Sequence, residues 1–216
     1  MKNIFYKKKW KNYWEDYYKI DVAPKESSLF AKFCLDNYLE EGNTVIELGC
    51  GNGRDALFFA LNNVKVKAVD QCEKELSLLS KKASLPNLEF VCDDFTNLND
   101  DNVYDSVYSR FTLHSVDSCG EDNVIKWCSD HIKLGGYFLI EARGQNNELY
   151  GKGIAVKGEK NAFIYEKHYR RFINLKIIKK KLKQSRFKLK LIEESNGFSP
   201  YNGKDEKFLR IVGEKI

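Results

Sequence analysis

The sequence predicts an α/β fold, a three-layer sandwich whose mostly parallel, seven-stranded sheet is closed by an antiparallel C-terminal hairpin. Short β-branched and aromatic runs alternate with helical segments over residues 44–142, which is typical of a parallel sheet. After residue 190, two apolar runs follow each other with no room for a crossover helix. We therefore expect the last two strands to pair antiparallel.

Each expected strand is a short apolar run that ends in a polar or small residue. The parallel strands are expected at residues 44–50, 64–70, 88–92, 104–109 and 137–142, and the hairpin strands at 188–193 and 208–212. The helices between them are expected at 54–61, 73–83 and 122–132. Residues 1–40 are expected to be helical, with Trp14 and Tyr18 four positions apart on one face.

Length and composition favour one compact domain. The chain has 216 residues, of which 43% are apolar and 13% aromatic, enough to bury one substantial core. Its net charge is +5, but residues 167–190 hold eleven Lys or Arg and no acid, so the basicity is local. We expect a cytoplasmic protein without a membrane segment, because no apolar run is long enough to span a bilayer and no leader pattern is present. The six cysteines lack metal-binding spacing and are expected to be reduced thiols.

A glycine-rich turn, Glu-Leu-Gly-Cys-Gly-Asn-Gly-Arg-Asp, joins the first strand to the following helix at residues 47–55. Glycine lets backbone N–H groups and a helix N-terminus approach a ligand at this edge of an α/β sheet. A dinucleotide-binding fingerprint would need glycine at position 54, which is arginine, and the phosphate loop ending in Gly-Lys-Ser/Thr is absent. Glu47 precedes the turn, and Asp70 and Asp94 follow the next two strands.

In this ordered set, residues 44–143 resemble the class I S-adenosylmethionine (SAM)-dependent methyltransferases, which have a Rossmann-like fold. The resemblance implies that the loop glycines lie against the methionyl part of SAM and that Glu47 orients its ammonium group. It also implies that Asp70 accepts hydrogen bonds from both ribose hydroxyls. The loop glycines are Gly49, Gly51 and Gly53.

The resemblance further implies that Asp94 binds the adenine amino group beside Phe95, although Asp93 competes for that role and both aspartates suit a turn. Gln71 and Ser109 belong to the same implied cofactor set. Trp14 and Tyr18 suit either a lid over the cofactor or core packing. The implied single domain divides into a helical lid (1–43), a cofactor-binding core (44–143), a substrate-side insertion with a basic helix (144–186) and a hairpin (187–216).

The implied reaction mainly requires that a nucleophile be aligned with the methyl group, with S-adenosylhomocysteine as the second product. A hydroxyl nucleophile also needs a proton acceptor, and His114, after the fourth strand, and His168, after the fifth, are both candidates. His131 is expected to be a surface or packing residue late in a helix. No carboxylate cluster suited to metal-assisted methylation stands out, so no metal is predicted.

The substrate is expected to be a small anion. Arg110 and Arg143 end strands four and five, so they point toward the edge where ligands of such folds bind, unless they pair with surface acids. The stretch Lys-His-Tyr-Arg-Arg-Phe (167–172) adds Tyr169, Arg170 and Arg171, and its guanidinium groups suit a phosphate or carboxylate.

Residues 145–172 also resemble small bacterial methyltransferases associated with capsule and other surface polysaccharides, some of which modify phosphoramidate-bearing precursors. This resemblance implies O-methylation of a sugar nucleotide or a related phosphorylated metabolite. The Lys- and Asn-rich composition agrees with an AT-rich bacterial genome.

Two alternatives remain open. The lysines of residues 176–190 suit an RNA methyltransferase, although Leu175, Ile178 and Leu182 recur at helical spacing and make those lysines the solvated side of a helix. A non-catalytic, cofactor-binding partner subunit is the other. The motifs of exocyclic-amine and cytosine-C5 DNA methyltransferases are absent after the fourth strand. The sequence does not define the oligomeric state.

Overall fold

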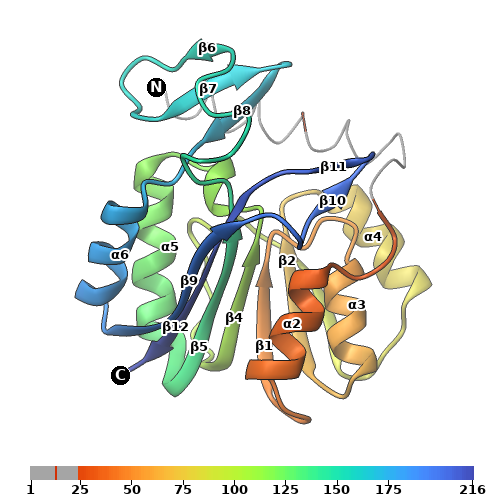
Figure 1. Cartoon of the computed structure of the whole chain (residues 1–216). Helices are drawn as coiled ribbons and strands as arrows, with labels where there is room; N and C mark the ends of the chain where they lie inside the picture. The colour runs from red at the N-terminus through yellow and green to blue at the C-terminus, as the bar shows by residue number, and fades with distance from the viewer. Residues whose placement is uncertain (1–12, 14–23) are drawn as a thin grey trace.

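The computed structural model describes Tyr13 and residues 24–216. Seven strands form one mixed sheet with the order β3-β2-β1-β4-β5-β12-β9 (Figure 1). The strands are β1 (Thr44–Leu48), β2 (Lys65–Asp70), β3 (Leu88–Cys92), β4 (Tyr104–Arg110), β5 (Ile132–Ala142), β9 (Phe187–Ser195) and β12 (Phe208–Lys215). The first five pair in parallel, and β12 pairs antiparallel with both β5 and β9. The predicted fold class is confirmed.

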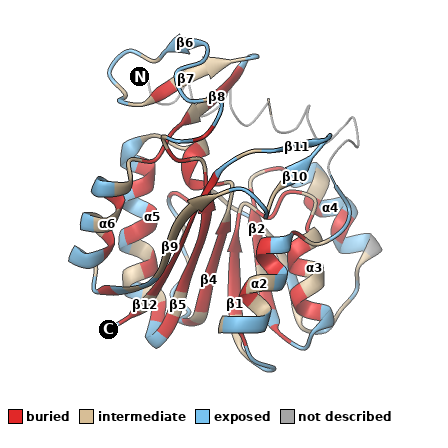
Figure 2. Cartoon of the chain, viewed as in Figure 1, coloured by how far each residue is buried: buried red, intermediate tan, exposed pale blue. Residues whose placement is uncertain are grey.

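Helices cover both faces of the sheet, which gives three layers (Figure 1). One face carries α2 (Leu29–Tyr38), α3 (Arg54–Leu61) and α4 (Glu73–Lys82), and the other carries α5 (Ser118–His131) and α6 (Leu175–Gln184). Each interface contains its own apolar cluster of buried residues. The burial colours agree, because the central strands are almost wholly buried while the outer sides of the helices are exposed (Figure 2).

Side-chain caps define where three of the helices begin. Ser28 accepts a hydrogen bond from the N–H of residue 31 at the start of α2, and Asp117 and Asn174 do the same at the starts of α5 and α6. In α6, Ile178 and Leu182 are buried while most of the lysines face outward. The predicted amphipathic helix is therefore present.

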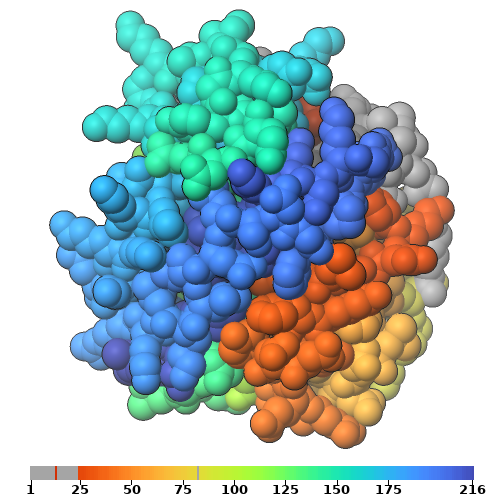
Figure 3. Space-filling model, in the orientation of Figure 1, coloured from red at the N-terminus to blue at the C-terminus, as the bar shows by residue number. Residues whose placement is uncertain are grey.

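Two small antiparallel elements were not predicted. One is a three-stranded sheet of β6 (Ile154–Ala155), β7 (Ala162–Tyr165) and β8 (His168–Arg171), and the other is a hairpin of β10 (Pro200–Tyr201) and β11 (Lys204–Asp205). Both stand over the end of the main sheet toward which the parallel strands point (Figure 1). In the space-filling view, the connection between β9 and β12 lies against this small sheet and the region of α2 (Figure 3).

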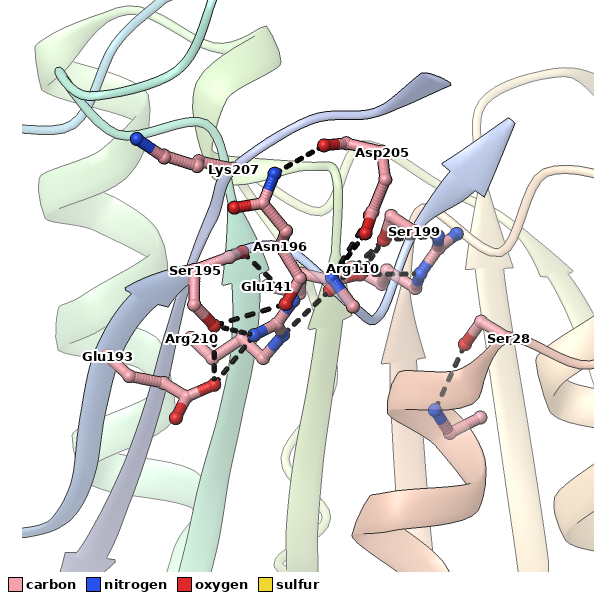
Figure 4. Close-up of polar contacts among 12 residues, drawn as sticks. Ser28, Arg110, Glu141, Glu193, Ser195, Asn196, Ser199, Asp205, Lys207 and Arg210 are labelled. Atoms are coloured by element: carbon pink, nitrogen blue, oxygen red, sulfur yellow. Dashed lines mark hydrogen bonds and ion pairs between the residues drawn. The ribbon is translucent and has the colours of Figure 1, made fainter. Parts of the chain in front are cut away.

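A row of alternating charges crosses four neighbouring strands beneath that connection (Figure 4). Arg110 on β4 faces Glu141 on β5, Glu141 faces Arg210 on β12, and Arg210 faces Glu193 on β9. Their salt bridges measure 2.8, 3.1 and 2.6 Å, and the side chains of Glu141 and Arg210 are fully buried. Ser199 donates to Glu141 at 3.1 Å, which fastens the β9–β12 connection to the sheet.

Candidate functional site

The glycine turn after β1 is held by backbone hydrogen bonds to the neighbouring strand. The N–H groups of Gly49 and Cys50 donate to the carbonyl oxygen of Val69 at 2.7 and 2.9 Å. The three loop glycines have φ values of 70°, 55° and 70°, a conformation that residues with a Cβ rarely adopt. A Cβ on Gly49 would also collide with the methyl group of Thr112. Glycine is therefore needed here for both backbone shape and close packing.

Asp70 lies at the carboxyl end of β2 and is 8% exposed. Its Oδ2 accepts from the N–H of Gly51 at 2.9 Å, and its Oδ1 accepts from the N–H of Cys72 at 2.9 Å. The carboxylate therefore ties the glycine turn to the start of α4. Because each oxygen has a second lone pair, the same carboxylate still suits the two ribose hydroxyls.

Glu47, on β1, is 4% exposed, and its Oε2 is buried without a hydrogen-bond partner among the described residues. Burial, and then the charge of Asp55, raise the pKa of this carboxyl well above its usual value, although Arg110 and Arg54 oppose the shift. A buried carboxyl with an open acceptor fits a cationic group, and the ammonium group of SAM is such a cation. The residues present therefore fit the predicted cofactor.

Asp93 and Asp94 follow β3, and both take part in a turn. Asp94 accepts from the N–H and the hydroxyl of Thr96 at 2.9 and 2.6 Å, while Asp93 accepts from the N–H of Asp94 at 2.7 Å. Both carboxylates thus help to shape the loop, and the choice between them as the adenine contact stays open.

Three other residues belong to the predicted cofactor set, namely Phe95, Ser109 and Gln71. The Phe95 ring lies at Gly49, where an added Cβ would be 3.5 Å from Cε1. Ser109 is fully buried, and its hydroxyl lies 2.5 Å from that of Thr112. Gln71 sits between Asp70 and the N-terminus of α4, where its carbonyl oxygen accepts from the thiol of Cys92 at 3.9 Å.

The chain enters the domain across the glycine turn. Asn52 donates to the carbonyl oxygen of Pro24 at 2.8 Å, and Arg54 donates to that of Glu26 at 3.0 Å. Asp55 accepts from both the N–H and the hydroxyl of Ser28, at 2.7 and 2.8 Å. Residues of the turn and of α3 therefore position residues 24–28.

The predicted lid residues Trp14 and Tyr18 lie outside the described residues. Their neighbour Tyr13 is described, and its ring stacks on His168 with the centroids 4.3 Å apart. This contact places Tyr13 on the predicted substrate side.

His114 lies in a 3₁₀ turn, Leu113–Ser115, and is buried. Its Nδ1 accepts from the backbone N–H of Arg143 at 3.1 Å, so Nε2 carries the hydrogen in the neutral ring. Burial, and then the charges of Arg143, His168 and Arg170, lower the pKa of His114 well below its usual value. The neutral ring of His114 can therefore donate a hydrogen bond from Nε2, and its role as a proton acceptor stays a prediction.

His168 lies on β8 and is 7% exposed. Burial, and then the charges of Arg170 and Arg143, lower its pKa to about 3. The ring is thus neutral at physiological pH.

Arg143 and Arg170 form the cationic part of the site. Arg143 follows β5, and its Nη1 contacts both Asn147 Oδ1, at 2.8 Å, and Glu206 Oε2. Arg170 donates to the carbonyl oxygen of Tyr165 at 3.2 Å, and no salt bridge joins it to a residue in the described part of the chain. Burial, and then the charge of Arg143, lower the pKa of Arg170.

Two of the predicted substrate-binding arginines are paired with acidic residues of the protein itself. Arg110 pairs with buried Glu141 in the charge row. Arg171 is 7% exposed and donates to the carbonyl oxygens of Val116 and Leu113 at 3.0 and 3.2 Å and to Glu121 at 2.5 Å. Both guanidinium groups are therefore engaged by buried carboxylates, and their contact with a substrate stays a prediction.

Strand alternation explains why, among the described residues, Arg171 is paired with a buried carboxylate while Arg170 is not. Because β8 is a strand, His168 and Arg170 share one face, while Tyr169 and Arg171 share the other. Tyr169 is accordingly buried, at 6% exposure, on the face of β8 opposite to that of Arg170.

Sequence reasoning missed three residues of this site, namely Tyr13, Asn147 and Glu206. Asn147 donates to the carbonyl oxygen of Lys207 at 2.7 Å and thereby joins the insertion to the β9–β12 connection. Glu206 is 63 positions from Arg143 in the chain, so no local pattern indicates the pair. Tyr13 is similarly remote from His168.

Within the described residues, no group of three or more His, Cys, Asp or Glu side chains is placed to hold a metal ion. No helix among them is both long and apolar enough to cross a membrane.

Comparison with known families identifies the chain. The model of the family "tellurite resistance protein TehB" matches residues 5–155, well over half of the sequence. The chain belongs to the TehB family. A probable SAM-dependent methyltransferase TehB from Haemophilus influenzae is 29% identical over 107 residues, which cover 49% of this chain and 37% of that protein. This TehB-family chain spans between 37 and 44% of the lengths of the curated relatives it matches first.

Solved structures share the fold. A SAM-dependent methyltransferase from Methanosarcina mazei superposes with a TM-score of 0.73 at 20% identity, covering 84% of this chain and 96% of the other. The 1,6-didemethyltoxoflavin-N1-methyltransferase of Burkholderia thailandensis, solved with S-adenosylhomocysteine, has a TM-score of 0.64 at 16% identity and covers 86% and 76%. These structures confirm the predicted Rossmann-like fold, that of SAM-dependent methyltransferases.

Proposed function

We propose that this TehB-family protein transfers a methyl group from SAM to an oxygen atom of a small, anionic, phosphorylated metabolite. The observation that carries the proposal is the position of Arg143 and Arg170 beside two neutral histidines, at the same edge of the sheet as Glu47 and Asp70. The carboxylates suit the cofactor, and the guanidinium groups suit a phosphate.

When bound, SAM supplies an activated methyl group on a sulfonium centre. The protein's contribution is to hold both reactants in line, which is worth roughly 7 to 11 kcal/mol of the barrier. Glu47, Asp70 and the glycine turn hold the cofactor side. Arg143 and Arg170 orient the substrate through its anionic group.

The two histidines take different roles in this proposal. His114 donates from Nε2, because its Nδ1 already accepts from Arg143. His168 is the candidate proton acceptor for a substrate hydroxyl. Burial, and then the charges of Arg170 and Arg143, lower the pKa of His168, and a bound phosphate would oppose the part that comes from the two arginines.

Sugar nucleotides and phosphoramidate-bearing capsule precursors are the substrate classes we favour. Support comes from the resemblance of residues 145–172 to capsule-associated methyltransferases. Residues 144–172 also include β6, β7 and β8, which stand over the carboxyl edge of the sheet (Figure 1), and β8 carries Arg170.

The direct test is incubation of the full chain with methyl-labelled SAM and a panel of sugar nucleotides, nucleotides and phosphoramidates. Mass spectrometry then locates the methyl group. We expect transfer to oxygen on a phosphorylated compound. Transfer to nitrogen, or turnover with unphosphorylated compounds only, would overturn the proposal.

Replacing Arg170 with Lys is expected to raise the substrate KM about tenfold with little change in kcat. Lysine keeps the charge but loses the planar pair of donors that a phosphate can use. Steady-state kinetics at saturating SAM measure this effect. The control is Lys167→Arg, which exchanges the same two residue types in the other direction at an exposed position of the same stretch. An unchanged KM in the Arg170 variant would show that Arg170 does not bind the substrate.

RNA methylation receives less support from the structure. Exposed lysines do line α6, but α6 lies along a face of the sheet and not over its carboxyl edge (Figure 1). Lys181 is also committed to Glu121 and Asp122, at 2.6 Å each. A salt-dependent gel shift with tRNA would favour this alternative.

A further inference from the structure

We propose that Glu121 and Arg171 form a buried ion pair that positions His114 for the reaction. This inference rests on the proposed function and concerns the same site. Glu121 lies on α5, outside the set of residues predicted for that site, and acts on it through the guanidinium group of Arg171.

Glu121 is a carboxylate in the first turn of α5 and is 2% exposed. Its two oxygens accept from two different elements. Oε2 accepts from Nη2 of Arg171 on β8 at 2.5 Å, and Oε1 accepts from Nζ of Lys181 on α6 at 2.6 Å. Charge-assisted hydrogen bonds of this kind are short and strong. Glu121 therefore holds the guanidinium group of Arg171 in one orientation.

In that orientation, Arg171 holds both sides of the 3₁₀ turn that carries His114. Its Nε donates to the carbonyl oxygen of Val116 at 3.0 Å, and its Nη2 donates to that of Leu113 at 3.2 Å. These two carbonyl groups lie on either side of His114 in the chain. A guanidinium group presents its N–H donors in a rigid fork. Arg171 therefore fixes where the turn lies against β8.

The strand that carries Arg171 also carries the other candidate groups. β8 packs against the 3₁₀ turn, and His168 and Arg170 lie on the face of β8 opposite to that of Arg171. The ion pair thus holds the turn from behind, while the site residues face the other way. Its effect is to set the position of His114 relative to His168.

The arginines proposed to hold the substrate's anionic group are placed by other contacts. Nη1 of Arg143 contacts Asn147 and Glu206. Nη1 of Arg170 donates to the carbonyl oxygen of Tyr165 at 3.2 Å. Loss of the ion pair should therefore disturb the turn more than it disturbs the binding of an anion.

The test is NMR spectroscopy of the histidine ring nitrogens in the full-length, ligand-free protein at neutral pH. In the wild type, the ring hydrogen of His114 should reside on Nε2, because Nδ1 accepts from the N–H of Arg143 at 3.1 Å. Glu121→Gln removes the charge that fixes Arg171, so the turn should loosen and both ring tautomers of His114 should be populated. His131, at the far end of α5, is an internal reference whose signals should not change.

Lys181→Met is the matched control, because it removes the other partner of Glu121 and leaves Arg171 in place. It should not change the signals of His114. Arg171→Lys keeps the positive charge but loses the planar fork, so it should change them as Glu121→Gln does. If Glu121→Gln does not fold, Arg171→Lys decides. Unchanged signals of His114 in these two variants, or an equal change in Lys181→Met, would overturn the positioning role.

Kinetics in the methyl-labelled SAM assay provide the second measurement. Glu121→Gln is expected to lower kcat on the order of tenfold, because His114 is misplaced, while the KM for the phosphorylated substrate stays within about twofold. An unchanged kcat would also overturn the role.

The NMR measurement uses neither SAM nor a substrate, so its failure leaves the proposed function standing. Conversely, a wild type that shows the expected signals of His114 but methylates no phosphorylated compound would overturn the proposed function. The effect of the ion pair on His114 would then remain as observed.

Discussion

Replacing Glu141 with Gln is expected to lower the free energy of unfolding by about 3 to 5 kcal/mol, the usual result of breaking a buried ion pair from one side. Glu141 is fully buried between two arginines, with Oε1 toward Arg210 and Oε2 toward Arg110. An amide presents one acceptor and one donor, so the variant would direct N–H groups at one of the two guanidinium groups. That arginine would stay buried without its counterion.

Urea denaturation of the ligand-free protein measures this effect. Glu193→Gln is the matched control, because Glu193 also binds Arg210 but its side chain is 40% exposed. Water can replace the lost contact there, so a loss below about 1 kcal/mol is expected. Equal losses of unfolding free energy in the two variants would show that burial does not determine how much each ion pair of the charge row stabilises the protein.

Replacing Glu47 with Gln is expected to weaken SAM binding by about 10- to 100-fold, because a charge-assisted hydrogen bond to the ammonium group becomes a neutral one. Isothermal titration calorimetry measures the change. Asp70→Ala would also weaken binding, but it leaves the N–H groups of Gly51 and Cys72 unpaired and so disturbs the loop itself. Glu47 therefore gives the sharper test.

The same residue predicts a pH dependence. Burial raises the pKa of Glu47 in the ligand-free protein, so its carboxyl is protonated at pH values where an exposed glutamate is ionised. An ammonium group favours the ionised form, so binding releases a proton. SAM affinity should then rise with pH from the usual glutamate value up to the raised one.

Calorimetry in buffers of different ionisation enthalpy measures the released proton. The Glu47→Gln variant should lose both the proton release and the pH dependence, while Glu40→Gln, at an exposed position, should keep them. A wild type that binds SAM without proton release would show that Glu47 does not face the ammonium group.

The main sheet was predictable because its signals are local. The β3 strand, Leu88–Cys92, has the expected bounds, since an apolar run and two aspartates define it. The ends of other strands were predicted less accurately. For example, β5 begins at Ile132, five positions before the expected start. The glycine turn and Asp70 were found for the same reason, as each directly follows a strand.

The substrate side was less predictable because long-range contacts determine it. The stretch 167–172 shows a dense group of cations, but only its folding as β8 shows that Arg170 and Arg171 face opposite ways. The partner of Arg110 lies 31 positions away, on a strand whose register no local pattern specifies. Glu206 was missed because its partner comes from another connection.

The contact between Gly49 and Thr112 constrains how this sequence can change. A larger residue at 49 would need both a left-handed backbone and the space now filled by the methyl group of Thr112. Neither residue can be replaced by a larger one without a change at the other, although the two are 63 residues apart and belong to different loops. Among related chains, a departure from glycine at the first position should therefore accompany a smaller residue at the second, so that the two are inherited as one unit.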